Sequence, residues 1–349
     1  MLLKYTIRVY NRLMETLDIN TGIRKENKNY NALDLVKFIL AFFVVAIHID
    51  PFSPEVYEEA EFLNYYSQQL VCRLAVPFYF AVSGFLVFAK IDIKNPDSAY
   101  IKKYCFKILR LLGTWFFLLY AGGKYQLWYM GAVVLAVVLI YMMLKIRLNL
   151  IVITIVSVVC YSIGVLGDSY QHVLAALRES HVWVEKIAHA YEVLYMDNTR
   201  NGVLFGLLFV VIGVILAKKK IKIPLPVSIA GAFVSFLLMT RELVILRNVY
   251  ELEYCRSLIF MPVCIFFLLQ IFINLDLKGR LYKSIRVWGN LIFYMHLIVC
   301  HFIKLFADKY ELVDVKNHLY LYTIIYTTAI AIVIELISRK RRWLRYLYS

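Results

Sequence analysis

A lysine and a histidine lie in one apolar stretch of the sequence, at a spacing that puts both side chains on the same face of a helix. Lys37 and His48 lie eleven residues apart within residues 33–50. On an α-helix, at about 100° per residue, they fall within about 20° of one face and about 16 Å apart along the axis. A histidine is a base near pH 7, and a lysine binds phosphate. The simpler interpretation is that Lys37 snorkels to lipid headgroups and His48 is interfacial.

The next apolar stretch, residues 68–90, carries Arg73 four residues before Pro77. A guanidinium is always charged, so within a membrane it needs an anionic or carbonyl partner. Arg73 is predicted near the outer side, at about the depth of His48. There it can hold an anionic acceptor or stabilise an oxyanion. Ser83 and Gly84 favour close approach of a neighbouring helix.

Other polar residues sit at the ends of apolar stretches. A basic cluster opens the third stretch and suits phosphate groups, although the bias of cytoplasmic loops towards Lys and Arg explains it as well. Its members are Lys102, Lys103, Lys107 and Arg110. Arg200 is predicted as an acceptor-side charge at the outer start of the sixth stretch. Trp128 and Tyr129 are typical of the aromatic belt at a membrane interface. The alternative is a functional role, in which they stack on a sugar.

Two histidines in the ninth stretch are close in sequence but not on one face. His296 and His301 are five residues apart, which is about 140° around a helix. At most one of them is therefore expected to face a central pocket. We expect that residue to be His296.

The composition predicts the elements that position these residues. Of 349 residues, 62% are hydrophobic and 18% charged, and the net charge is +15. A single soluble core does not accommodate so much apolar sequence, and disorder and nucleic-acid binding are excluded on the same ground. The six scattered cysteines predict neither disulfides nor a metal site. We predict an all-α integral membrane protein of the plasma membrane with ten spanning helices, at residues 33–50, 68–90, 104–121, 126–144, 148–166, 201–217, 224–240, 257–274, 288–307 and 319–338.

Charge sets the predicted topology. Of the 39 Lys and Arg residues, 27 fall in the terminal segments and alternate connections that lie on one side of such a ten-helix chain. The positive-inside rule then places both termini in the cytoplasm. Residues 1–30 are predicted as a cytoplasmic or interfacial segment, and residues 31–349 as a single membrane domain.

The motifs, in their order and spacing, resemble the membrane acyltransferase family 3. They are the Lys-x10-His spacing, the Arg-x3-Pro-Phe-x4-Ser-Gly-Phe segment from Arg73, Leu127-Trp128-Tyr129, Arg200-Asn201-Gly202, and the segment from Gly289 to His296 in the ninth stretch. Within that family, Ala75-Val76-Pro77-Phe78, Gly167-Asp168-Ser169 and residues 197–202 resemble the membrane domain of vancomycin-resistance serine racemases.

The resemblance implies an O-acyltransferase that transfers groups other than aminoacyl groups. The donor would be cytoplasmic acyl-CoA, often acetyl-CoA, and the acceptor a hydroxyl of an extracytoplasmic or lipid-linked carbohydrate or other molecule. His48 would be the base or the acyl carrier, with Lys37 and Arg73 beside it. The basic cluster would hold coenzyme A. Ser83, Trp128, Tyr129, Arg200, Asn201 and His296 would meet the substrate, with membrane lipids as further partners and no metal.

The sequence departs from the family in two places. Lys37 stands where the family usually has arginine, and the basic pair that follows the second helix has no clean counterpart except Lys107. Because the chain ends soon after the tenth stretch, we expect no racemase domain. Transport of L-serine or a similar small amino acid, and a non-catalytic role in a surface-polymer pathway, stay open as alternatives.

Overall fold

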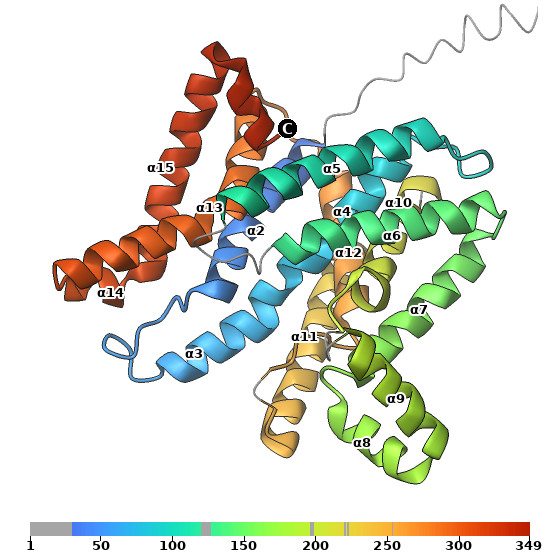
Figure 1. Cartoon of the computed structure of the whole chain (residues 1–349). Helices are drawn as coiled ribbons and strands as arrows, with labels where there is room; N and C mark the ends of the chain where they lie inside the picture. The colour runs from blue at the N-terminus through green and yellow to red at the C-terminus, as the bar shows by residue number, and fades with distance from the viewer. Residues whose placement is uncertain (1–29, 120–126, 196–198, 220, 222, 253) are drawn as a thin grey trace, which may run out of the picture. The chain divides into compact units, whose positions relative to one another are not determined.

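A computed structural model describes residues 30–119, 127–195, 199–219, 221, 223–252 and 254–349 (Figure 1). Within these ranges the chain is helical and contains no β-strand. Residues Asn31–Ser349 form one compact unit. The α-helices are α2 (Asn31–His48), α3 (Ala60–Tyr66), α4 (Ala75–Phe88), α5 (Ser98–Leu118), α6 (Trp128–Lys145), α7 (Leu150–Leu166), α8 (Gln171–Ser180), α9 (Val182–Tyr195), α10 (Leu207–Lys218), α11 (Leu225–Tyr250), α12 (Met261–Asn274), α13 (Tyr282–Lys309), α14 (Val313–Asn317) and α15 (Leu319–Lys340).

Short irregular turns join several of these helices. Two of them, η1 (Ser67–Val71) and η2 (Cys72–Leu74), connect α3 to α4 and make Ala60–Phe88 one continuous helical run. The segment η4 (Gly202–Gly206) leads into α10, and η5 (Arg342–Leu347) follows α15.

Each of the ten apolar stretches contains a helix, but not every helix is long enough to cross a membrane alone. In the described chain six helical runs are long and apolar enough, and α7 with α8, bent by 93°, makes a seventh if the pair is one span. The segments Gly202–Lys218 and α12 are apolar but shorter, and the basic cluster interrupts the first half of α5. The fold is thus that of a multi-pass helical membrane protein, while ten spans and cytoplasmic termini stay predictions.

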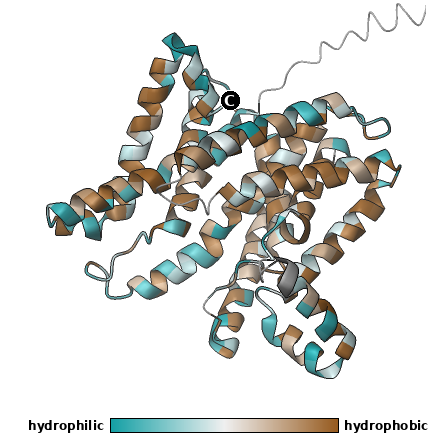
Figure 2. Ribbon diagram, viewed as in Figure 1, coloured by the Kyte–Doolittle hydropathy of each residue, from teal (hydrophilic) through white to brown (hydrophobic). Residues whose placement is uncertain are grey.

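Apolar side chains face outward as they do in lipid. On α7 the residues Ile151, Ile155, Val159 and Ile163, one helical turn apart, are each more than half exposed. Figure 2 shows the hydrophobic character of this helix along its length. A row of this kind on a soluble protein would be an aggregation site, whereas in a bilayer it contacts acyl chains.

Two glycines let α4 and α10 pack backbone to backbone. A Cβ added at Gly84 would lie 2.1 Å from the carbonyl oxygen of Val210, and one at Gly213 would lie 2.0 Å from that of Ala81. No side chain fits at either position, so the expectation of close packing at Gly84 is confirmed. This contact holds α4, which carries Ser83, in the centre of the helices.

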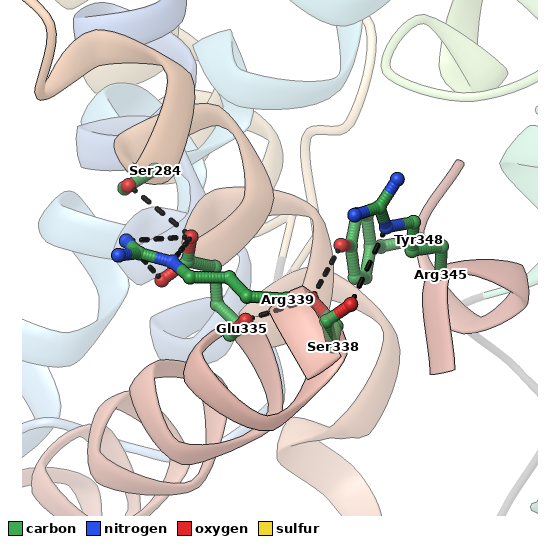
Figure 3. A network of polar contacts seen from close by, with 6 residues as sticks. All are labelled: Ser284, Glu335, Ser338, Arg339, Arg345 and Tyr348. Carbon is green, nitrogen blue, oxygen red and sulfur yellow. Dashed lines mark hydrogen bonds and ion pairs between the residues drawn. The ribbon is translucent and has the colours of Figure 1, made fainter. Parts of the chain in front are cut away.

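Polar contacts gather where α13, α15 and η5 meet (Figure 3). Glu335 pairs with Arg339 at 3.0 Å, one turn along α15, and accepts a hydrogen bond from Ser284 of α13 at 3.5 Å. The hydroxyls of Ser338 and Tyr348 lie 2.8 Å apart, and Arg345 donates to the Ser338 carbonyl. These contacts place Tyr348 beside the first cavity described below.

We predict that Gly213→Val destabilises the protein by about 3 kcal/mol, because the new side chain collides with the backbone of α4. Thermal unfolding of the purified protein in detergent measures the change. The matched control is Gly113→Val, since a Cβ at Gly113 meets no atom within 4 Å. Equal unfolding midpoints for the two variants would contradict the close α4–α10 contact.

Candidate functional site

Helix α2 carries both ends of the site. Lys37 lies in its first half and lines one cavity, while His48 is its last residue and lines another. The helix is regular throughout, so the axial separation of about 16 Å predicted from the spacing holds. One rigid element therefore fixes the distance between a cation and a base.

The larger cavity, here called the lysine cavity, has a volume of about 250 Å³ and lies between α2, α4, α5, α6 and α13. Its polar lining consists of Asp34, Lys37, Tyr79, Ser83, Tyr104, Lys107, Tyr129, Arg286, Asn290, Tyr294 and Tyr348. The rest is apolar. A cavity with these walls fits an extended ligand with polar ends, which is typical of cofactor sites.

A bidentate ion pair closes one end of the lysine cavity. Nε and Nη2 of Arg286 on α13 donate to both carboxylate oxygens of Asp34 on α2, at 2.7 to 3.0 Å. Asp34 is buried and Arg286 is half-exposed. Since Lys37 and Lys107 also line this cavity, three positive charges face a single carboxylate. The excess positive charge favours an anion such as a phosphate.

The smaller cavity, here called the histidine cavity, has a volume of about 50 Å³. Its polar lining is His48, Arg73, Trp128, Tyr129, Arg200 and Arg256. The Arg200 guanidinium lies over the Trp128 ring, 5.8 Å from the centroid. Burial and the neighbouring guanidinium of Arg256 lower the pKa of Arg200 from its ordinary value. Arginines crowded in this way favour a bound anion.

Aromatic rings separate the two cavities. Tyr129 and Phe293 line both of them, with ring centroids 5.8 Å apart. Tyr79 packs against both rings at 6.0 and 5.7 Å, and its hydroxyl donates to the Lys37 carbonyl at 2.6 Å. The hydroxyls of Ser83 and Tyr129 are 3.2 Å apart. Tyr129 and Phe293 are the two residues that both linings share, so the cavities adjoin at this aromatic pair.

His296 meets His48. The two rings stack with centroids 5.4 Å apart and planes at 29°. Nδ1 of His296 donates to the carbonyls of Ile292 and Phe293, at 3.1 and 3.0 Å, which leaves Nε2 as an acceptor. Among the residues that the structure describes, this fully buried Nε2 has no hydrogen-bond partner. His301, by contrast, is exposed. His296 turns inward as expected but packs on His48 instead of facing a pocket, and neither histidine is among the residues that line the two cavities.

Of the other residues predicted from the sequence, some line a cavity and others do not. Lys107 lines the lysine cavity, but Lys102 and Lys103 are exposed on α5 and do not. Arg110 donates to the Ser349 carbonyl oxygen and lies over the Tyr346 ring, 4.8 Å from its centroid. Asn201 caps η4, because its side-chain oxygen accepts from the backbone N–H groups of Val203 and Leu204 at 2.9 and 2.8 Å.

Sequence reasoning missed three charged residues of these cavities. Asp34 lies one turn before Lys37, and this spacing was the available signal. Arg286 and Arg256 were counted only as loop charges that mark opposite sides of the membrane. Their convergence on a cavity comes from helix packing that one sequence does not reveal.

Comparison with known proteins supports the resemblance. Residues 30–123 match the family model described as "Acyltransferase domain", which spans α2 to α5 with Lys37, His48, Arg73 and the basic cluster. The match confirms the predicted resemblance and, with the apolar helices, supports a multi-pass membrane protein.

Two curated relatives are racemases of enterococci. A serine/alanine racemase of Enterococcus gallinarum is 25% identical over 345 residues, covering 90% of this chain and 47% of that protein. An amino-acid racemase of Enterococcus faecalis is 26% identical over 211 residues, covering 54% of this chain and 28% of that protein. The chain thus spans less than half the length of either. No solved structure matches it.

We predict that Arg286→Ala destabilises the protein by about 2 kcal/mol, because it leaves the buried Asp34 carboxylate without its partner. The half-exposure of Arg286 keeps the loss below that of a fully buried pair. The double variant Asp34→Asn/Arg286→Ala should recover part of the loss in the thermal unfolding midpoint. Lys278→Ala is the control, since its contact with Asp276 is exposed and 4.0 Å long. An Arg286→Ala midpoint equal to that of the control would contradict this role.

Proposed function

We propose that this protein is an integral-membrane O-acyltransferase that transfers a short acyl group, acetyl, from acyl-CoA to a hydroxyl of an extracytoplasmic or lipid-linked acceptor. One observation carries the proposal. Lys37 and His48 on one helix line two cavities that share the wall of Tyr129 and Phe293. The acyltransferase family match over the same helix supports the reaction class.

The lysine cavity is proposed as the donor site, opening to the cytoplasm. Lys37 and Lys107 would pair with anionic oxygens of the donor, since an ammonium binds phosphate as a point charge. Lys102, Lys103 and Arg110, on the same helix as Lys107, would meet the more distant phosphates of coenzyme A. The thin pantetheine arm would then reach towards Tyr129 and Phe293, bringing the thioester to the His48 side.

At the histidine cavity His48 would act as the base. It takes the proton of the acceptor hydroxyl as that oxygen attacks the thioester carbonyl. The tetrahedral oxyanion develops beside Arg73, whose charge stabilises it. The C–S bond then breaks, the ester is formed, and the coenzyme A thiolate takes the proton back from His48. An alternative order, in which the imidazole first accepts the acyl group and then passes it to the hydroxyl, uses the same residues.

His296 would hold His48 in place. Its ring is fixed by two carbonyls of its own helix and stacks on the His48 ring. The exposure of His48 leaves its other face open to an acceptor. This gives His296 a positioning role and His48 the chemical role.

We predict that His48→Ala lowers acyl transfer by at least about 100-fold, the usual contribution of a general base. The measurement uses purified protein in nanodiscs, labelled acetyl-CoA and a membrane-lipid or polysaccharide acceptor extract. His301→Ala is the matched control, because His301 lies outside both cavities. Unchanged transfer by His48→Ala would overturn the proposal, as would serine uptake into proteoliposomes with no acylation by the native protein.

We predict that Tyr129→Ala shifts donor preference towards longer acyl groups, because it removes one side of the passage between the cavities. The ratio of butyryl-CoA to acetyl-CoA transfer should rise by about 10-fold or more, as expected for two methylenes that gain room. Tyr141→Ala, on the same helix but outside both cavities, should leave the ratio unchanged. An unaltered ratio in Tyr129→Ala would show that the acyl group does not pass this point.

A further inference from the structure

The charged side chains that line the histidine cavity are all positive. Three guanidiniums, of Arg73, Arg200 and Arg256, belong to its wall, and no acidic side chain lines it within the described residues. The guanidiniums come from distant parts of the chain: η2, the segment before η4, and the segment before α12. Such convergence costs free energy unless something negative offsets it, because like charges repel strongly away from bulk water.

The protein itself supplies little compensation. In the part of the chain that the structure describes, neither Arg73 nor Arg256 has a carboxylate within ion-pair distance. Arg73 donates from Nε to the Gln69 side chain at a long 3.3 Å. The nearby buried carboxylate of Asp168 accepts instead from the backbone N–H of Arg256, at 2.9 Å, and from the Ser169 hydroxyl. Two guanidiniums therefore retain donors for a ligand.

The cavity is also small. A cavity needs about 10 to 15 Å³ to hold one water molecule. The volume of about 50 Å³ of the histidine cavity therefore holds a group of only a few heavy atoms. This is room for a carboxylate or phosphate with the adjoining carbons. The exposed side of His48 leaves the remainder of a larger acceptor outside.

We propose that the histidine cavity binds the anionic group of the acceptor, so that the acceptor is a hydroxyl compound bearing a carboxylate or phosphate close to the hydroxyl. This inference rests on the proposed acyl transfer and narrows its acceptor. Arg256 binds the anion, Arg73 keeps its proposed place beside the oxyanion, and the neighbouring hydroxyl of the acceptor then lies against His48. Guanidiniums suit the task because they bind planar or tetrahedral oxyanions through two donors at once.

The test compares three-carbon hydroxyl compounds that carry no anionic group, a carboxylate or a phosphate. Purified protein in nanodiscs receives labelled acetyl-CoA with glycerol, glycerate or glycerol 3-phosphate. At least one anionic acceptor should be acylated with a kcat/KM about 10- to 100-fold above that of glycerol, the effect of charge-assisted hydrogen bonds. Preference for glycerate assigns a carboxylate, and preference for glycerol 3-phosphate assigns a phosphate. Equal rates with all three would overturn the inference while leaving acyl transfer intact.

Variants separate anion binding from the reaction itself. Arg256→Gln should raise the KM for the preferred anionic acceptor by about 10-fold or more, and it should change the KM for glycerol little. Arg256→Lys should restore part of the loss. Arg241→Gln, an exposed arginine outside both cavities, is the control. If Arg256→Gln lowers the rates of all acceptors equally while its unfolding midpoint matches that of the control, the residue does not select the anion. Failure of the native protein to acylate any acceptor or to bind acetyl-CoA would instead contradict the proposed function.

Discussion

The bidentate ion pair between Asp34 and Arg286 is the contact on which the rest of the arrangement depends. It joins α2 to α13 and so fixes how the two helices face each other. Gly289, whose added Cβ would lie 3.1 Å from the Cα of Phe38, lets them approach closely. With that register set, Lys37 faces one cavity and His48 stacks on His296 further along the same two helices. A slip of one residue would rotate both α2 side chains by about 100° and separate them from their partners.

The same register keeps the two cavities apart along α2. The lysine cavity and the histidine cavity each carry excess positive charge, yet their linings share only Tyr129 and Phe293. Passage of a charged group between these rings would strip it of its polar partners and cost free energy. A small uncharged acyl group carries no such cost. The proposed transfer thus moves the one part of the donor that an apolar constriction admits.

Part of this was predictable from the sequence alone, where local periodicity decides the outcome. The spacing of Lys37 and His48 was sufficient to place them on one helix face. The five-residue offset of His296 and His301 predicted that at most one would turn inward, and His296 is buried against His48 while His301 is exposed. Tertiary packing decided the rest. Arg256 and Arg286 look like ordinary loop charges, Asn201 proved to be a helix cap, and Lys102 and Lys103 resemble Lys107 in sequence but not in location. The short α12 was expected as a full span because hydropathy does not record where a helix begins.

We propose that a bound donor extends from Lys37 at one end to His48 at the other. A cryo-EM structure of the protein in nanodiscs with a non-hydrolysable acetyl-CoA analogue is the direct test of this proposal. We expect phosphate density beside Lys37 and Lys107, a pantetheine arm running between Tyr129 and Phe293, and the acetyl carbon within about 4 Å of the His48 ring, close to a near-attack distance. An analogue bound away from the lysine cavity, or with its acetyl group on the far side of the aromatic wall from His48, would contradict it.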